Sequence, residues 1–445
     1  MTLPSSVLLE REVYFEYDSD SGSGEIERIP PAIGVPPSPQ DIKDAILTYL
    51  QIQTPDAHFE NLPKLSYIRF LRPTNFIPWL CGDITDAFIA SADKDLVALY
   101  AGPYRPGTNL KGAYLIYETS SNSLSTIPQP PNVDGERLYV GLGAVVVCLE
   151  DGAYVLGELT KVRGSAHSQA ALYTWQLSTK EWVLKVASFP PELCPPNHVF
   201  EADMCFSYRG ASSVLCWVDL FKGMLVCDLR QALHPVAQLE FRFVPLPKEC
   251  PTYDRGISIE ESLEAGMYRS IACVGDSIKL VTMDGYCERP ANELRLTIWT
   301  LSPDLCDWSK GSEYLVSDIW ASETHISLGL PKILPSFPVL SMDGDDVVYL
   351  FFTDMTMSVN GQLDYKGQYL LRVDMRHNKV SHHPQSGDPI CSQLFATDCS
   401  AYLLQGLKGN QVILLITPNH ILFHLFSYMC SQMIKSKCLY TTQLN

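Results

Sequence analysis

The sequence predicts an all-β protein: a β-propeller of five or six four-stranded blades, preceded by a short N-terminal extension that contains one helix. Three observations predict this fold class. From about residue 67, short apolar runs rich in Val, Ile, Leu and Tyr alternate with turns of Gly, Asp, Asn, Ser and Pro, which is the pattern of strands. The runs group in fours. Helix signals are almost absent there, apart from a short one around 258–267, whereas an α/β fold needs a helix after nearly every strand.

Residues 1–65 differ in composition from the rest and are expected to form the extension. A strand is predicted over 12–18 (EVYFEYD), and the Ser/Gly-rich and Pro-rich stretch that follows is typical of a linker. A helix is predicted within 38–55, because Ser38 can cap it, Pro39 suits its first turn and Asp41 completes a capping-box spacing. One face of this helix is apolar, so we expect it to pack on the main body. That face consists of Ile42, Ala45, Ile46, Tyr49 and Leu50.

The main body is expected to span residues 66–418 and to consist of the strand groups. The first group is DLVALYAG, AYLIYET and LSTIPQPP, with a first strand somewhere in 66–87. The second is AVVVCLE, YVLGELT, ALYTWQL and EWVLKVA, and the third is DMCFSYRG, SVLCWVDL, GMLVCDL and LEFRFVPLP. The fourth is RSIACVG, SIKLVTMDG, LRLTIWTL and SEYLVSDI, and the fifth is FPVLSMDG, DVVYLFFTDM, QYLLRVDM and KVSHHP. A partial sixth is LFATDC, AYLLQG and QVILLITP.

The third run of each group has a common form, an apolar stretch that ends just before a polar turn. Equivalent positions near the end of that run are Tyr117, Trp175, Cys227, Trp299 and Val373. Such repetition suits a radial array of sheets, in which each sheet buries both faces against its neighbours. The recurring phrase is therefore expected to be the outer hairpin of a blade.

The C-terminal part, residues 419–445, is expected to be a divergent tail. Residues 411–430 approach the length of a membrane span, but Pro418, Asn419, His420 and His424 interrupt them, and spanning needs about 20 uninterrupted apolar residues. We therefore expect a last strand over 412–416 and no transmembrane segment.

The charge balance disfavours one class of function. The chain has 33 Lys and Arg against 50 Asp and Glu, a net charge of −17, and it has no basic cluster with interleaved aromatic residues. Such a chain repels phosphate backbones, so we expect no nucleic-acid binding.

The cysteines and the N-terminus indicate a reducing compartment. Most of the 14 cysteines sit inside apolar runs without the spacing of a metal module, so we expect buried, reduced thiols. Disulfides or zinc are the alternative. The first residues lack a basic region before an apolar run, so they do not form a secretory signal. A cytoplasmic or nuclear location is expected.

Several central phrases resemble a known family. These are LCWVDLFKGMLVCDL, LTIWTLSPDLCDWSKGSEYLVSDIW and LPSFPVLSMDGDDVVYLFF, within a similarity that spans roughly residues 85–405. The most specific parts are Trp217–Asp219 with Gly223, and the segment from Trp299 to Trp308. Together they resemble the plant family called domain of unknown function 1618. The resemblance implies a β-propeller similar in style to plant F-box-associated domains, with no established enzymatic role and no defined site residues. No F-box follows the Leu-Pro pair at 62–63.

Sequence motifs for chemistry are missing or incomplete. No phosphate-binding loop, dinucleotide fingerprint or nucleophile elbow occurs, so we expect no cofactor and assign no catalytic or metal residue. The stretch DSDSGSGE at 18–25 lacks two ligands of a calcium loop. The cluster RHNKVSHHP at 376–384 is typical of an exposed hairpin, and DGDD at 343–346 of a turn. A cation site remains the alternative for each of these stretches.

Three residues are candidates for contact with a partner protein. Arg105 lies in PYRPGTN (103–109) and Arg163 in KVRGSAHSQ (161–169), both typical of exposed loops. Trp308 lies between strands, where an aromatic side chain can anchor a partner or fill the gap between blades.

The functional hypothesis is a non-enzymatic interaction module, in which loops on rigid blades bind a partner protein. The alternative is a hydrolase or lyase with its active site at the propeller channel, built from Asp and His residues of inner strands. Such a site is assembled across blades and needs no local motif. A structural subunit of a larger assembly is a third possibility.

Overall fold

The computed structural model describes most of the chain up to residue 399. The described residues are 5–17, 27–29, 38–62, 64–72, 76–78, 84–102, 112–131, 140–141, 143–161, 169–193, 200–210, 212–251, 265–283, 285–286, 289–344, 346–357, 363–384 and 394–399. The chain divides into two compact units. Unit 1 is Met1–Leu246, Pro303–Cys306 and Phe395–Gly406, and unit 2 is Pro247–Ser302, Asp307–Leu394 and Leu407–Asn445. In the described part, no helix combines the length and the apolar composition that crossing a membrane requires.

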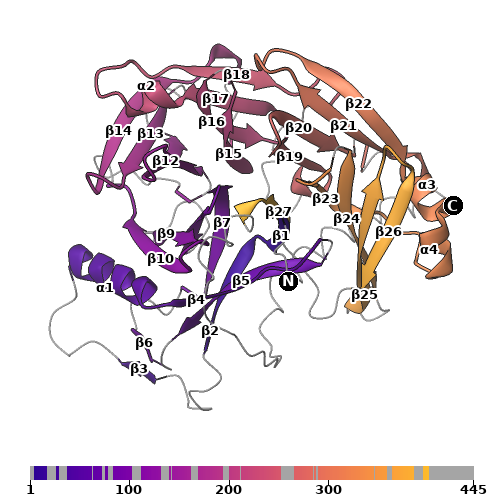
Figure 1. Ribbon diagram of the computed structural model, residues 1–445, viewed down its shortest axis with the longest axis horizontal. Coiled ribbons are helices and arrows are strands. Elements are labelled where there is room, and N and C mark those ends of the chain that lie inside the picture. Colours follow the sequence, from indigo (N-terminus) through magenta and orange to yellow (C-terminus); the bar gives the residue numbers. More distant parts are fainter. Residues whose placement is uncertain are drawn as a thin grey trace. The chain divides into compact units, whose positions relative to one another are not determined.

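The described chain is mostly β-strand, as predicted, and four of its sheets are four-stranded, antiparallel and built from consecutive strands (Figure 1). Unit 1 contains two of them. The first comprises β11 (Ala144–Cys148), β12 (Tyr154–Lys161), β13 (Gln169–Gln176) and β14 (Glu181–Ser188). The second comprises β15 (Met204–Arg209), β16 (Ser213–Asp219), β17 (Gly223–Asp228) and β18 (Phe241–Pro245). The short helices η3 (Pro191–Leu193) and α2 (Leu229–Leu233) lie in their connections.

Unit 2 contains the other two four-stranded sheets. One comprises β19 (Arg269–Val274), β20 (Ser277–Thr282), β21 (Arg295–Leu301) and β22 (Trp308–Leu315). The other comprises β23 (Ser336–Leu340), β24 (Val347–Met357), β25 (Leu363–Asp374) and β26 (Lys379–Pro384). Four short helices accompany them: η4 (Ala265–Met267), η5 (Ala291–Glu293), α3 (Val316–Ala321) and α4 (Glu323–Ser327). These four sheets confirm the second to fifth strand groups.

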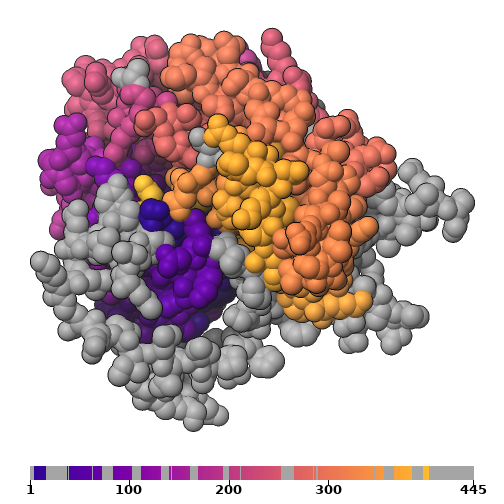
Figure 2. Space-filling view, turned by 45° about the vertical axis from the view of Figure 1, so that its right-hand side comes forward, coloured from indigo at the N-terminus to yellow at the C-terminus, as the bar shows by residue number. Residues whose placement is uncertain are grey.

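A larger mixed sheet in unit 1 joins the first strand group to the N-terminal region. Its strands run in the order β10–β9–β8–β7–β2–β5–β1–β27, and β4 pairs with β5. Their bounds are β1 Val7–Glu10, β2 Glu12–Tyr17, β4 Thr54–His58, β5 Leu65–Arg72, β7 Asp86–Asp93, β8 Leu96–Ala101, β9 Ala113–Glu118, β10 Ser123–Pro128 and β27 Leu394–Thr397. Figure 2 shows atoms of β1, in indigo, beside atoms of β27, in yellow. Two short strands, β3 (Glu27–Ile29) and β6 (Phe76–Pro78), form a separate pair.

The first strand of the first group lies later than predicted. It was expected within 66–87, but β7 begins only at Asp86 and pairs with β8. Its sequence DAFIASAD contains small residues that weaken the apolar signal, although its middle residues are buried. The strand that does occupy 65–72, β5, pairs instead with β1, β2 and β4, which come from the predicted extension.

The predicted N-terminal helix is confirmed as α1 (Pro39–Gln51). Ser38 caps it: the Asp41 N–H donates to Ser38 Oγ at 3.2 Å, and the Ser38 N–H donates to Asp41 Oδ2 at 2.9 Å. These two bonds satisfy N–H groups that have no partner within the helix. Ile46, Tyr49 and Leu50 are buried in the same core as β2, β5 and β7, so the helix packs on the sheet as expected.

The first strands of the first three strand groups pack against one another in unit 1. These are β7, β11 and β15, and each contacts the other two. Cys205 on β15 illustrates the proximity, because its thiol lies 3.5 Å from the carbonyl oxygen of Ala90 and 3.1 Å from that of Ala144. Polar side chains near this place can therefore meet although they are far apart in sequence.

Candidate functional site

One face of the β2–β7 strand pair carries a group of acidic residues. In the antiparallel register, Glu12 lies opposite Phe88 and Tyr14 lies opposite Asp86. Directly opposed residues share a face of a sheet, and so do residues two apart on one strand. Glu12, Tyr14 and Asp86 therefore project from the same face, and all three are half-buried. The opposite face is apolar, with Val13, Phe15, Ala87 and Ile89 in the core.

Glu10, at the end of β1, joins this group through a firmly anchored turn of backbone. The intervening residue, Arg11, is only 3% exposed. Its Nε donates to the carbonyl oxygen of Ile89 at 3.0 Å, and its Nη2 donates to that of Asp203 at 3.0 Å. Its guanidinium lies 4.4 Å from the centre of the Phe88 ring. Arg11 thus fixes the backbone that carries Glu10 and Glu12 against β7 and the start of β15.

We call Glu10, Glu12, Tyr14 and Asp86 the acidic face. Burial raises the pKa of Glu10 to about 7, and the neighbouring charge of Glu12 adds to the rise. Burial also raises the pKa of Glu12. A hydrogen bond from Tyr14 opposes this rise, and the negative charge of Asp86 adds to it. The pKa of Asp86 is raised by burial too, and the Thr85 hydroxyl, 3.0 Å from its Oδ2, opposes this rise.

The electrostatic character of the acidic face follows from these neighbours. Among the described residues, none of its three carboxyl groups forms an ion pair with Lys or Arg. Glu10 is therefore partly protonated near neutral pH, whereas Glu12 keeps a hydrogen bond that favours its charged form. A protonated and an ionised carboxyl group side by side can donate one proton and accept another, which is the requirement of acid–base catalysis.

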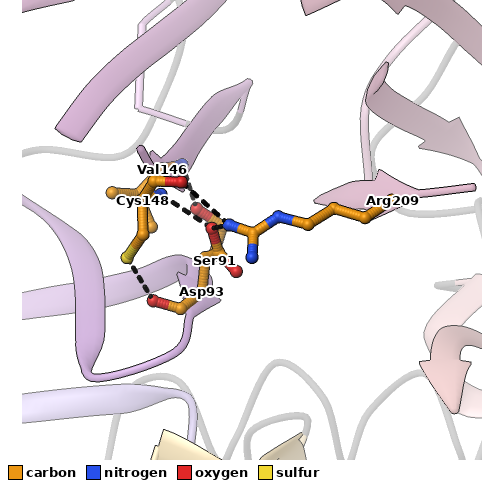
Figure 3. Close-up of polar contacts among 5 residues, drawn as sticks. All are labelled: Ser91, Asp93, Val146, Cys148 and Arg209. Carbon is orange, nitrogen blue, oxygen red and sulfur yellow. Dashed lines mark hydrogen bonds and ion pairs between the residues drawn. The ribbon is translucent and has the colours of Figure 1, made fainter. Parts of the chain in front are cut away.

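A second polar group lies where the strands β7, β11 and β15 end (Figure 3). Asp93 Oδ2 accepts from the Cys148 N–H at 2.7 Å and from Arg209 Nη2 at 2.6 Å. The same Nη2 donates to the Cys148 carbonyl oxygen at 2.9 Å, and Ser91 Oγ accepts from the Val146 N–H at 2.9 Å. Each bond joins two different sheets. This network therefore fixes the ends of three strands relative to one another within unit 1.

The thiol of Cys148 is unsuited to chemistry at this place. Burial raises its pKa to about 12, and the charge of Asp93 adds to the rise. The thiol donates to the Asp93 carbonyl oxygen at 3.0 Å. A nucleophile or a metal ligand must be a thiolate, so the protonated Cys148 serves packing and hydrogen bonding. Burial likewise raises the pKa of Cys227 to about 12, and all eight cysteines whose state is described are free thiols.

A third polar group surrounds Glu158 on β12, whose side chain is fully buried. Tyr114 donates to its Oε2 at 2.9 Å, and the Gly141 N–H donates to its Oε1 at 3.1 Å. Burial raises its pKa to about 8, and these bonds oppose the rise. Because the side chain has no exposure to solvent, Glu158 has a structural role.

The candidates from the sequence are not among the residues of these groups. Arg105 and Arg163 are outside the described residues, and Trp308 is the first residue of β22, opposite Leu301. Their role in binding a partner stays a prediction. The stretch at 18–25 is also outside the described residues. Within the DGDD stretch, Asp346 accepts from the Ser312 hydroxyl at 2.7 Å, a contact that suits a turn.

The described histidines and acids do not gather around a metal position. His377 contacts its neighbour Asp374, with 2.9 Å between Nδ1 and Oδ1, and His382 lies on β26. In the part of the chain that the structure describes, no group of three or more His, Cys, Asp or Glu side chains could hold a metal ion.

Sequence reasoning missed the acidic face. The alternation of Glu10, Glu12 and Tyr14 with the apolar Val13 and Phe15 was visible, and it signals a strand with one polar face. The pairing of β2 with β7 was not visible. It brings Asp86 next to residues more than seventy positions earlier, and no local pattern encodes that contact.

Part of the chain matches a known family model. Residues 217–349 match the model of a family described as a protein of unknown function, DUF1618. This match supports the resemblance seen in the sequence for that segment. No curated protein matches the chain.

Three similar solved structures are glycosidases. A GH43 β-1,3-galactosidase is 11% identical with a TM-score of 0.29, and the match covers 65% of this chain and 57% of that one. An exo-β-1,3-galactanase from Phanerochaete chrysosporium is 11% identical with a TM-score of 0.31, and the match covers 68% and 66%. An α-L-arabinofuranosidase from Podospora anserina is 10% identical with a TM-score of 0.27, and the match covers 57% and 70%. The chain thus spans less than two thirds of the length of the first two.

These structures correct the leading functional prediction. The sequence was interpreted as a non-enzymatic module that binds a partner protein, whereas these three structures are glycosidases, which are hydrolases. The alternative prediction was a hydrolase or lyase. At such low TM-scores these structures assign neither a substrate nor a catalytic residue to this chain.

Proposed function

We propose that this chain is a hydrolase whose active site is the acidic face, and that its four-stranded sheets are blades of a β-propeller. One observation carries the proposal: Glu10 and Glu12 are neighbouring, half-buried carboxyl groups in different environments, and among the described residues neither is neutralised by a cation. Pairs of this kind divide the roles of acid and base between two identical chemical groups.

The roles follow from the environments. Glu10, with a pKa of about 7, keeps its proton up to neutral pH and donates it to a leaving group. Glu12, which accepts a hydrogen bond from Tyr14, is the base that activates water. Asp86 lies opposite Tyr14, and its negative charge adds to the rise in the pKa of Glu12. The anchored Arg11, between β1 and β2, holds in place the backbone that carries the two carboxyl groups.

The bond best suited to this chemistry is a glycosidic bond. Its cleavage needs one carboxylic acid to protonate the leaving oxygen and one carboxylate to activate water or to attack the sugar. Neither step needs a cofactor or a thiolate. The proposed substrate class is therefore a saccharide or another glycoside.

Hydrolysis of a panel of nitrophenyl glycosides tests the proposal. We expect the full chain to cleave at least one of them, and Glu10→Gln and Glu12→Gln each to lower kcat by about 10²–10⁴-fold, the usual contribution of a general acid or base. Glu181→Gln is the matched control, because Glu181 is an exposed carboxyl group at the start of β14 and its side chain makes no hydrogen bond or ion pair with the described residues.

The pH profile separates the two roles. The wild-type rate should fall above about pH 7 as Glu10 loses its proton, and Glu10→Gln should lose that limb while Glu12→Gln keeps it. Circular dichroism confirms that the variants are folded. The proposal is overturned if no glycoside in the panel is cleaved, or if folded Glu10→Gln and Glu12→Gln retain the wild-type rate.

A further inference from the structure

Unit 2 contains a polar cleft that the proposed hydrolase site does not use. It has a volume of about 410 Å³ and lies between the helices α3 and α4 and the start of β26, which are neighbours in Figure 1. Its lining consists of Tyr314, Asp318, Ala321, Ser322, Glu323, Thr324, Asn378, Lys379 and Val380. This volume is in the range of small-molecule sites, about 300–1,000 Å³.

The wall of the cleft is held in place by a specific contact. Thr324 on α4 donates through its hydroxyl to the carbonyl oxygen of Val380 on β26, at 2.7 Å. Ser322 caps α4 by accepting the His325 N–H at 3.2 Å, and the buried ring of His325 packs edge-on against Phe352. The two sides of the cleft therefore stay at a fixed separation without a ligand.

The charges in the cleft are unpaired. Asp318, Glu323 and Lys379 are exposed, and within the described part of the chain their side chains form no hydrogen bond or ion pair with the protein. Tyr314 lies close to Asp318, since the charge of Asp318 adds to the rise that burial causes in the pKa of Tyr314. Two anions and one cation thus face one space without neutralising one another.

We propose that this cleft binds a small ligand with two cationic groups and one carboxylate, the charge pattern of a basic amino acid. The two cationic groups would pair with Asp318 and Glu323, and the carboxylate would pair with Lys379. A neutral ligand would gain no charge pairing in the cleft, and an acidic one would be repelled by two carboxylates. The inference is independent of the hydrolase site, which lies in unit 1.

Isothermal titration of the full chain with L-arginine tests the inference. We expect one saturable site of modest affinity that weakens as NaCl is added, because exposed ion pairs are screened by salt. Asp318→Asn, Glu323→Gln and Lys379→Met should each weaken binding about fivefold, the typical effect of losing one exposed pair. L-glutamate and glucose should bind much more weakly than L-arginine.

Two matched variants control for charge alone. Glu293→Gln and Lys248→Met remove exposed charges of the same kinds outside the cleft and should bind L-arginine as the wild type does. All substituted side chains are exposed, so the variants should keep the wild-type melting temperature. The inference is overturned if L-arginine gives no saturable binding, if the cleft variants bind as the wild type does, or if glucose binds as tightly as L-arginine.

Discussion

Glu10 on the acidic face and the fully buried Glu158 on β12 are two glutamates whose pKa is raised by burial, to about 7 and about 8. Their surroundings differ. Glu158 is fully buried, and each of its oxygens accepts a hydrogen bond, from Tyr114 and from the Gly141 N–H. Glu10 is half-buried beside a second carboxyl group, Glu12.

This difference in exposure decides whether the proton of a carboxyl group only stabilises the fold or can be transferred to a bound molecule. A carboxyl group enclosed on all sides holds its proton as part of the fold, because no ligand can reach it. A half-exposed carboxyl group with a similar pKa can exchange its proton with a bound molecule. A raised pKa is thus a sign of function only where the group is also accessible.

Replacing the buried carboxyl group should have the largest effect on stability. Glu158→Leu leaves the Tyr114 hydroxyl and the Gly141 N–H buried without their partner, and each such loss costs about 1–3 kcal/mol. We therefore expect the free energy of unfolding to fall by about 2–4 kcal/mol in urea denaturation. Glu158→Gln is the control and should lose less, since it keeps one acceptor oxygen. A Leu variant as stable as the wild type would show that the hydrogen bonds of Glu158 are dispensable for stability.

The raised pKa of Glu10 should also make the stability of the fold depend on pH. Glu10 binds its proton more tightly when folded, with a pKa of about 7 against the ordinary 4.5. Between these two pKa values the folded state holds more protons than the unfolded state, so stability should fall as the pH rises through this window. The part due to Glu10 is about 1–3 kcal/mol, reduced from the full shift because the side chain is partly exposed.

Urea denaturation between about pH 5 and pH 8 measures this effect. Glu10→Gln should remove the part of the fall that ends near pH 7 and should leave the part that Glu158 causes up to about pH 8. Equal slopes for the wild type and Glu10→Gln would mean that Glu10 ionises as it does in the unfolded chain.

Removing the cationic partner of Asp93 should have the smallest effect on stability. Asp93 is 12% exposed and Arg209 is 40% exposed, and Asp93 keeps the Cys148 N–H as a donor when the guanidinium is removed. Arg209→Met should therefore lower the free energy of unfolding by about 1 kcal/mol, with a smaller loss at high salt. Arg230→Met, at an exposed arginine on α2, is the control and should be nearly neutral. A loss above about 3 kcal/mol would place Arg209 among the essential contacts.

Much of the fold could be predicted from the sequence, because strands, turns and caps are encoded locally. Ser38 and Asp41 marked the start of α1, and the apolar runs marked the four sheets from β11 to β26. The first strand of the first group was misplaced, because DAFIASAD combines alanines with polar residues, and its burial depends on its neighbours.

The candidate site could not be predicted in the same way. Glu10, Glu12 and Asp86 come together only through the pairing of β2 with β7, which depends on the tertiary fold. Of the residues chosen from the sequence, Arg105 and Arg163 were selected for their loop context and Trp308 as an aromatic residue between strands. Neither criterion tells which residues come together in the folded chain. Local motifs reveal a site only when its residues are close in sequence.

The pairing of β1 with β27 has a consequence for the order of folding. The two strands lie at opposite ends of the described chain, almost four hundred residues apart. A ribosome adds about 5–20 residues per second, so β1 waits about 20–80 s for its neighbour during synthesis. Over that interval its backbone edge is open to chaperones and to other chains, and the strand that carries Glu10 gains its last partner only after residue 397 has been synthesised.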